Sequence, residues 1–238
     1  MRQIVLDTET TGLSPKKGDR IVEIGCVELI DRKLTGNTYH QYINPQRDMP
    51  EEAFAIHGIS NEFLADKPVF SHIVKEFIDF VKDSELIIHN APFDVGFINH
   101  EISILGSTKK SLGINIIEDC CAIIDSLKLA KNLRPGQKNN LDALCRSYGI
   151  DNSNRDLHGA LLDSEILADV YLAMTGGQTN LSFSGQGKSG GANQEQIIRL
   201  DKNREKTIII MASEEEKIAH QSMIDMIEKK SGQVLWTK

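Results

Sequence analysis

The chain of 238 residues is poor in the features that mark membrane, disulfide-rich and zinc-binding proteins. No apolar run approaches the roughly 20 residues that a membrane-spanning helix needs, and we expect no signal peptide because the first residues already have the pattern of a strand. The four cysteines lack the paired C-x-x-C spacing that is typical of zinc sites. We therefore expect reduced thiols in a cytoplasmic protein.

Positive charge is also scarce in most of the chain. Residues 1–174 contain 18 Lys and Arg residues against 26 Asp and Glu residues, a net charge of −8, whereas residues 175–238 contain 9 against 8. A domain this acidic does not bind a phosphate backbone well by itself. If the substrate is a nucleic acid, metal ions must offset the charge locally and something else must keep the protein near its substrate.

The chain does contain short apolar strands and amphipathic helices in alternation. Strands are predicted at residues 4–6, 20–30, 37–43 and 86–88, the first three as an antiparallel meander. Helices are predicted at 69–82, 95–105, 123–131, 140–148 and 160–174, with short helical pieces at 51–65. Hairpin strands followed by strand–helix alternation indicate an α/β domain with a mixed central sheet and flanking helices.

The composition changes after residue 176. Residues 184–196 are rich in Gly, Ser and Gln, which is typical of a flexible linker. Ser213 and Glu216 then form a capping-box pattern before a helix whose apolar residues share one face. We divide the chain into a main domain (1–176), a short peptide (177–183), a linker (184–203) and a small C-terminal segment (204–238).

Two carboxylates follow the first apolar run, with one residue between them. Asp7 and Glu9 lie at positions i and i+2, so on an extended chain their side chains point to the same side. Two negative charges this close repel unless a cation lies between them, and oxygen ligands favour a hard ion such as Mg²⁺ or Mn²⁺. A solvated strand end would show the same two residues, so the context must decide.

Two further clusters combine histidine with a carboxylate near a helix start. The run His89-Asn90-Ala91-Pro92-Phe93-Asp94 places Asp94 on the first turn of a helix, where the helix dipole favours a negative charge. His158 is expected in the loop before the last helix of the domain, with Asp163 on its first turns. Because Asp163 stands among leucines, its carboxylate should face solvent or have a partner.

The patterns D-x-E, H-N-A-x-F-D and H-x-x-x-x-D in this order are far more specific together than any one alone. On these residues the sequence resembles the DEDDh 3′→5′ exonucleases, which have a ribonuclease H-like fold, and within them the proofreading epsilon subunits of bacterial DNA polymerase III. The resemblance covers the whole chain, with no departure at the carboxylates or the histidine. It implies a bacterial replication enzyme that releases mispaired 3′-terminal nucleotides of DNA as 5′-monophosphates.

The resemblance also implies a role for each residue of the motifs. Asp7, Glu9 and Asp163 would bind one Mg²⁺ or Mn²⁺ ion. Asp7 and Asp94 would bind a second, and two such ions stabilise the attacking and leaving oxygens of an in-line displacement at phosphorus. His158 would take a proton from the attacking water, and the reference pKa of histidine, about 6.5, suits a base at neutral pH.

The terminal nucleotide would be held by residues outside the three motifs. The resemblance assigns its binding to Glu52 and His57, in addition to Asp7, Glu9 and Asp163 of the motifs. From the sequence alone, Glu52 could equally be a helix-start carboxylate and His57 a turn residue before Gly58. The neighbourhoods of Ile56 and Phe93 would pack against the terminal base.

The tail carries a resemblance of its own. Gln178, Leu181 and Phe183 match the Q-x-x-L-x-F peptide by which bacterial proteins bind the hydrophobic pocket of the sliding clamp (beta). Residues 204–238 resemble the segment that docks the polymerase III alpha subunit, and their small apolar content favours burial against a partner. Tethering would raise the effective concentration of the acidic enzyme at the primer end. Whether a small theta-like subunit also binds stays open.

Two alternatives also stay open. An RNA-trimming DEDDh exoribonuclease, such as a ribonuclease T or an oligoribonuclease, would carry the same motifs, but a compact enzyme of that kind is not expected to carry the clamp-like peptide, linker and docking segment. A non-catalytic scaffold that bridges polymerase and clamp would have no use for a costly cluster of carboxylates. The sequence therefore favours the metal-dependent proofreading exonuclease.

Overall fold

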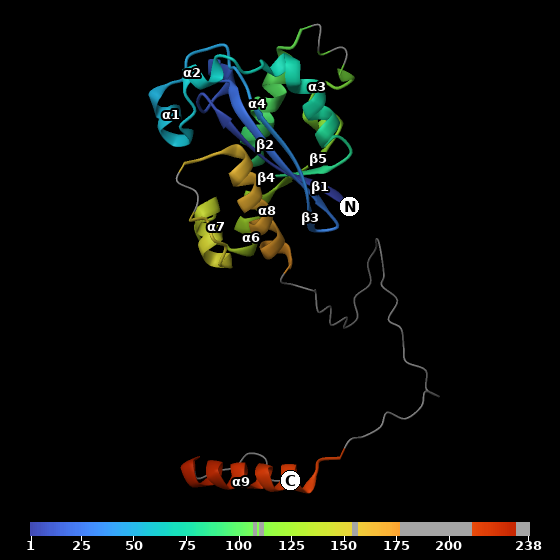
Figure 1. Cartoon of the computed structure of the whole chain (residues 1–238), viewed down its shortest axis with the longest axis vertical. Coiled ribbons are helices and arrows are strands. Elements are labelled where there is room, and N and C mark those ends of the chain that lie inside the picture. Colours follow the sequence, from blue (N-terminus) through green and yellow to red (C-terminus); the bar gives the residue numbers. More distant parts are fainter. Residues whose placement is uncertain (107–108, 110–111, 154–156, 177–210, 232–238) are drawn as a thin grey trace, which may run out of the picture. The chain divides into compact units, whose positions relative to one another are not determined.

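The structure is a computed structural model that describes residues 1–106, 109, 112–153, 157–176 and 211–231. The chain divides into two units, Met1–Ser182 and Phe183–Lys238, and each is described by itself. The first unit has a central sheet with helices on both faces (Figure 1). No helix in the described ranges is long and apolar enough to cross a membrane.

The sheet has five strands in the order β3-β2-β1-β4-β5, which places β1 in the centre. The strands are β1 (Arg2–Thr10), β2 (Ile21–Ile30), β3 (Lys33–Tyr42), β4 (Glu85–Ile88) and β5 (Ala122–Asp125). The pairs β1–β2 and β2–β3 are antiparallel, and the pairs β1–β4 and β4–β5 are parallel. The predicted mixed sheet with an antiparallel meander is confirmed.

The helices follow the predicted order. They are α1 (Glu51–His57), α2 (Asn61–Leu64), α3 (Phe70–Val81), α4 (Ala91–Ser103), α6 (Ser126–Leu133), α7 (Leu141–Tyr148) and α8 (Ala160–Gly176), with 3-10 turns η1 (Pro15–Lys17) and η2 (Ile117–Asp119). Helix α4 begins four residues earlier than predicted, because Pro92 is well suited to the first turn of a helix.

The prediction of one helix over residues 123–131 is wrong in its first part. Residues Ala122–Asp125 form the edge strand β5, and α6 begins only at Ser126. Periodicity cannot separate a short apolar strand from a buried helical turn, and the parallel pairing with β4 decides the matter. The side chain of Asp125 then accepts hydrogen bonds from the backbone of Leu127 and Lys128 and caps α6.

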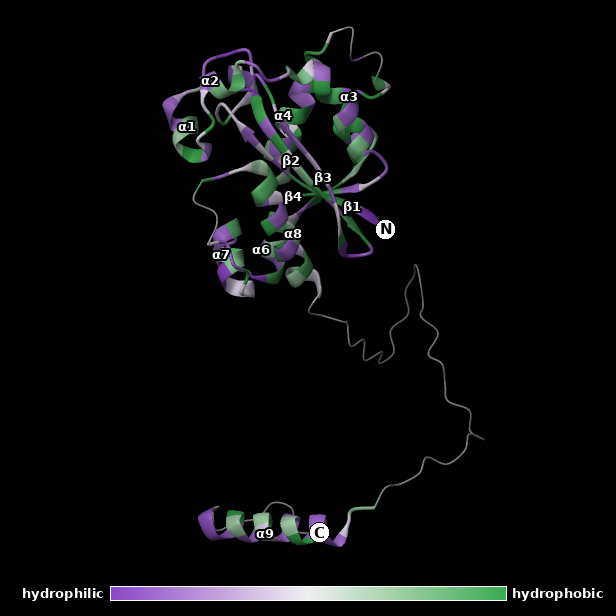
Figure 2. Ribbon diagram, viewed as in Figure 1, coloured by the Kyte–Doolittle hydropathy of each residue, from purple (hydrophilic) through white to green (hydrophobic). Residues whose placement is uncertain are grey.

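The alternation of side chains along β1 separates two hydrophobic clusters. Ile4 and Leu6 face α3 and α4, whereas Val5 faces α6, α7 and α8. All three side chains are fully buried. Figure 2 shows hydrophobic residues along the central strands between these two helical layers. The sheet is therefore covered on both faces, as expected for parallel strands inside an α/β domain.

Strand β2 holds the start of α8 against the sheet. A side chain at Gly25 would collide with the backbone of Ala160 and Leu161, so only glycine allows this close approach. The hydroxyl of Ser164 donates to the Gly25 carbonyl oxygen at 2.9 Å, and Glu23 accepts from the backbone N–H of Ala160 at 3.2 Å. The position of α8 is thus set by direct contact with β2.

A buried ion pair holds α4 to the segment before β2. The guanidinium of Arg20 donates two hydrogen bonds to the carboxylate of Glu101, at 2.7 Å each. Glu101 is 1% exposed, and its hydrogen bond to Arg20 raises the pKa of the guanidinium. The pair connects the loop after β1 with the last turn of α4.

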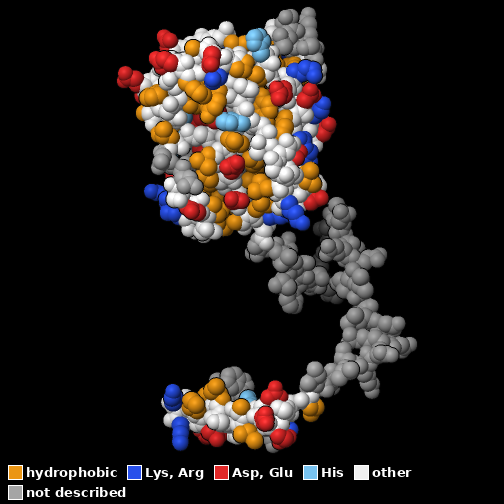
Figure 3. Space-filling model, viewed as in Figure 1, with side chains coloured by type: hydrophobic (Ala, Val, Ile, Leu, Met, Phe, Trp, Pro, Cys, Tyr) orange, Lys and Arg blue, Asp and Glu red, His pale blue; other side chains and the backbone are white. Residues whose placement is uncertain are grey.

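The second unit contains α9 (Glu214–Ser231). The predicted capping box is present, because the backbone N–H of Ser213 donates to Glu216 at 2.7 Å and that of Glu216 donates to the Ser213 hydroxyl at 3.2 Å. Figure 3 shows acidic side chains at one end of α9 and basic ones at the other. Its apolar side chains Ile218, Met223 and Met226 are exposed.

Other predictions about the tail lie outside the described residues. These are the clamp-binding-like peptide with Gln178, Leu181 and Phe183, the linker, and the ends of the C-terminal segment at 204–210 and 232–238.

Replacing Gly25 by Ala should lower the free energy of unfolding by about 1–3 kcal/mol, because the added methyl group forces α8 away from β2. Urea denaturation of the full chain measures this change. Gly96→Ala is the control, since its added methyl meets nothing within 4 Å on α4 and should not destabilise. Equal stabilities of the two variants would contradict the assigned contact.

Candidate active site

Three elements bring all five predicted catalytic residues to one cavity of about 350 Å³. Asp7 and Glu9 come from the last residues of β1, Asp94 from the first turn of α4, and Asp163 from the first turn of α8. His158 lies in the loop before α8, as predicted. The predicted helix positions of Asp94 and Asp163 are confirmed.

Alternation along β1 explains the direction of the carboxylates. Asp7 and Glu9 continue the register of Val5 and so lie on the α8 side of the sheet, whereas Thr8 continues the register of Leu6 and lies on the α4 side. Thr8 is the middle residue of the D-x-E pattern, and the sequence analysis assigned it no role. Its hydroxyl donates to Asp94 at 2.7 Å, so β1 contributes to the site from both of its faces.

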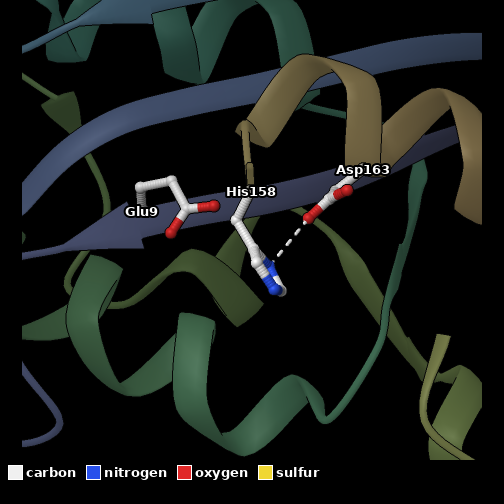
Figure 4. A group of neighbouring side chains, drawn as sticks. All are labelled: Glu9, His158 and Asp163. Carbon is white, nitrogen blue, oxygen red and sulfur yellow. Dashed lines mark ion pairs between the residues drawn. The ribbon is translucent and has the colours of Figure 1, made fainter. Parts of the chain in front are cut away.

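Glu9, His158 and Asp163 form the closest group (Figure 4). Their ligand atoms all lie within 4.8 Å of one another, and Nδ1 of His158 is 3.2 Å from the carboxylate of Asp163. Glu9 and Asp163 are 8% and 3% exposed, while His158 is largely open to solvent. Two buried carboxylates beside an imidazole suit a divalent cation. Asp7 and Asp94 line the same cavity outside this close group.

The carboxyl group of Asp94 has a strongly raised pKa. It is 3% exposed, and burial raises its pKa from an ordinary value of 3.8 to about 7, although the hydrogen bond from Thr8 acts in the opposite direction. Without a compensating positive charge, the ionised form of Asp94 is therefore costly. A cation in the cavity would remove this cost, which is a second sign that the residues fit a metal ion.

A second cavity of about 470 Å³ adjoins the first and shares Thr8, Glu9 and Phe93 with it. Both residues predicted to hold the terminal nucleotide, Glu52 and His57, line it. Most of its remaining wall is apolar or backbone-rich and includes Leu13, Pro50, Ala53 and Ile56. This combination suits a base packed against apolar side chains, with a few polar groups that bind its sugar.

His57 has a defined tautomer. Its Nδ1 accepts the backbone N–H of Ile59 at 3.1 Å, so Nε2 carries the hydrogen. Among the described residues, the buried Nε2 makes no hydrogen bond that meets the geometric criteria, although the backbone of Thr10 interacts with the ring and raises its pKa. Burial lowers the pKa of His57 and keeps the ring neutral. A buried donor without a partner at a cavity wall is suited to an oxygen of a bound molecule.

The wall of the second cavity directly contacts the loop that carries His158. The backbone N–H of His158 donates to the Ile56 carbonyl oxygen at 3.2 Å, and the side chain of Leu157 fills the space above Gly58. Helix α1 therefore supports the loop that carries His158. No motif in the sequence indicated this contact, because the two segments are about a hundred residues apart.

Besides Thr8, three polar residues that were not predicted as site residues line the first cavity: His89, Asn140 and Asp142. His89 is the first residue of the second motif, which by itself indicates no contact for its side chain. Its Nε2 donates to the carbonyl oxygen of Asn139 at 2.9 Å, and its Nδ1 lies 3.0 Å from the hydroxyl of Ser126. The signal for His89 in the sequence was its place in the second motif, directly after a buried strand.

Comparison with known proteins shows the family of the chain. The family model described as Exonuclease (RNase_T) matches residues 4–171. DNA polymerase III subunit epsilon of Salmonella typhimurium is 49% identical over 240 residues, which cover 99% of this chain and 97% of that protein. The epsilon subunits of Escherichia coli K12 (47% over 240 residues, 99% and 97%) and Rickettsia felis (48% over 230 residues, 96% and 98%) are similar to a comparable degree.

The chain belongs to the DNA polymerase III subunit epsilon family. It is a proofreading 3′→5′ exonuclease, so that prediction is confirmed in preference to the RNA-trimming enzyme and the scaffold. The exonucleases of this family depend on divalent metal ions.

Solved structures confirm the ribonuclease H-like fold of this epsilon-family chain. Exonuclease X in complex with 5′ overhanging duplex DNA is 27% identical, with a TM-score of 0.57 over 73% of this chain and 91% of that one. The nuclease domain of 3′hExo, a DEDDh family member bound to rAMP, has a TM-score of 0.58 over 73% and 90%, and at 19% identity it shows the fold alone.

In the metal-free protein, the charge of Asp94 should make stability depend on pH. Its folded-state pKa is raised, so between pH 3.8 and about 7 the unfolded chain loses the proton that the folded chain still holds. This contribution to stability therefore decreases as the pH rises through that window. Asp94→Asn should remove it, so that thermal unfolding in EDTA at about pH 5 and about pH 8 differs less in the variant.

The matched control is Asp79→Asn, which alters an exposed carboxylate on α3 whose pKa is lowered by Lys82 and Lys75. This control should leave the contribution of Asp94 in place. An identical pH dependence in Asp94→Asn and the unmodified chain would show that Asp94 carries no such cost.

Proposed function

We propose that this chain removes mispaired nucleotides from DNA 3′ ends as 5′-monophosphates, with Asp7, Glu9, Asp94 and Asp163 as metal ligands and His158 as the general base. The observation that carries the proposal is that all five side chains line one cavity, although they come from three separate regions of the sequence. Such convergence is not expected of solvated strand ends or helix starts.

Two Mg²⁺ or Mn²⁺ ions would be held at the first cavity. Asp7, Glu9 and Asp163 would hold one ion, and Asp7 with Asp94 the other. When bound, such ions neutralise charge on the phosphate and stabilise the attacking and leaving oxygens. The ions would also offset the repulsion among the carboxylates, which lie together in a domain that is already acidic.

Asp163 orients His158 for its role. A carboxylate accepts hydrogen bonds only, so at 3.2 Å it favours the tautomer in which Nδ1 of His158 carries the hydrogen. Nε2 is then the nitrogen that accepts the proton of the attacking water. The exposure of His158 allows the proton to pass on to solvent after the reaction.

The second cavity would receive the terminal nucleotide. The Nε2–H of His57 is a buried donor for an oxygen of the nucleotide, and Glu52 is an acceptor for a sugar hydroxyl. Ile56 and Phe93 would pack against the base. A cavity that takes one unpaired nucleotide favours mismatched ends because they fray more readily.

The rest of the chain would keep the enzyme at the primer end. We assign residues 1–176 as the exonuclease domain, 177–183 as the sliding-clamp peptide, 184–203 as the linker and 204–238 as the segment that docks the polymerase III alpha subunit, in the bacterial cytoplasm. The exposed apolar side chains of α9 support the docking role.

His158→Ala should lower kcat on a 3′-mispaired primer–template by about 10²- to 10⁴-fold, the usual contribution of a general base. Release of 5′-monophosphates with Mg²⁺ and with EDTA is the measurement, alongside an RNA oligomer of the same sequence. His72→Ala is the control, since His72 lies on α3, away from both cavities. Preferential cleavage of the RNA, or full activity of His158→Ala, would contradict the proposal.

The two tail segments should be separable by mutation. Leu181→Ala with Phe183→Ala should abolish capture of the sliding clamp while leaving capture of the alpha subunit intact, because only the apolar peptide is altered. Met223→Asp with Met226→Asp should have the opposite effect, since charge on an exposed apolar face opposes burial. Size-exclusion chromatography of each mixture reads out both interactions. Loss of both partners in either variant would refute the separate assignments.

A further inference from the structure

One segment of the acidic domain has the opposite charge. Residues 126–141 contain no carboxylate and four cations: Lys128, Lys131, Arg134 and Lys138. The segment comprises α6, the turn after it and the first residue of α7. Its three lysines are exposed, and among the described residues none of them forms an ion pair with a carboxylate. We call Lys131, Arg134 and Lys138 the basic ledge.

The ledge is built rigidly beside the first cavity. His89, which lines that cavity, donates to the carbonyl oxygen of Asn139 and contacts Ser126, so it holds the segment near both of its ends. Arg134 donates to the side chain of Gln137 at 2.8 Å and so stiffens the turn from within. The neighbouring Asn140 lines the cavity itself.

The positions of the two cavities indicate how a bound DNA strand runs across the site. The terminal nucleoside occupies the second cavity, and the scissile phosphate lies at the carboxylates, where Thr8, Glu9 and Phe93 line both cavities. The strand upstream of that phosphate must leave on the other side of the first cavity. His89 and Asn140 line the first cavity but not the second, and the basic ledge is joined to them through Asn139, which lies between Lys138 and Asn140 and accepts a hydrogen bond from His89.

We propose that Lys131 and Lys138 of the basic ledge bind backbone phosphates of the DNA strand immediately upstream of the scissile bond. The proposal rests on the function proposed above and adds the path of the strand. Charge supports it, because residues 126–141 carry four cations and no carboxylate within a domain whose net charge is −8, and cations are what a polyanion binds. Burial lowers the pKa of His89 and the charge of Lys131 lowers it further, which agrees with the closeness of Lys131 to the cavity wall.

Two substrates separate strand binding from chemistry. A single-stranded DNA oligomer has upstream phosphates, whereas the p-nitrophenyl ester of thymidine 5′-monophosphate has none, and both would be cleaved at the same carboxylates. In the full chain with Mg²⁺, Lys131→Gln with Lys138→Gln should lower the ratio of kcat/KM for the oligomer to that for the ester by about tenfold. The logarithm of kcat/KM for the oligomer should also fall less steeply with log[NaCl], by about 0.7 per lysine removed.

The matched control is Lys33→Gln. Lys33 is exposed and begins β3 next to Ile30, at the opposite end of the sheet from Asp7 and Glu9, so its removal should leave the ratio and the salt dependence as they are. Lys131→Arg with Lys138→Arg keeps both charges and should retain the ratio.

Three results would count against the ledge. A double Gln variant with the same ratio and salt dependence as Lys33→Gln would overturn it while leaving the proposed function intact. Equal losses on oligomer and ester would show that the lysines support the active site rather than the strand. Cleavage of neither substrate by the unmodified chain would instead refute the proposed function, and the ledge with it.

Discussion

The whole site depends on holding like charges together. A single cavity is lined by Asp7, Glu9, Asp94 and Asp163, and three of these four carboxylates are buried. Repulsion between them and the loss of water around them both raise the free energy of their charged forms. The fold keeps them together by placing them on three elements that are fixed independently. Cations bound in the cavity would offset this repulsion. The arrangement of the carboxylates therefore favours the binding of metal ions.

Each of these three elements is held in the fold by different contacts. Strand β1 is paired on both edges in the centre of the sheet. Helix α4 is tied by the buried Arg20–Glu101 ion pair and by Thr8. The start of helix α8 packs directly against the backbone of Gly25 and is held there by the hydrogen bonds of Ser164 and Glu23. Arg20, Glu101, Gly25, Ser164 and Glu23 line neither cavity, yet they set the positions of residues that do.

The parts of the site that could be predicted from the sequence are those with a local signature. Alternation placed Asp7 and Glu9 on one side of a strand, and glycine before an apolar helix placed His158 in a loop with Asp163 after it. The parts that could not be predicted depend on distant contacts. The residues next to Gly25 in the sequence do not predict that α8 packs against it. The position of His89 depends on its contacts with Ser126 and Asn139, which are far away in the sequence. The strand at Ala122–Asp125 was missed because its identity comes from pairing with β4.

The metal-bound structure is the most direct test of the central claim that these carboxylates exist to hold divalent ions. Crystals of the full chain grown with Mn²⁺ and a nucleoside 5′-monophosphate allow the ions to be located by anomalous scattering. The account predicts two ions in the first cavity, ligated by Asp7, Glu9, Asp94 and Asp163, with the nucleoside in the cavity lined by His57. A cavity without ions, or Mn²⁺ bound elsewhere while these carboxylates contact only one another, would contradict it.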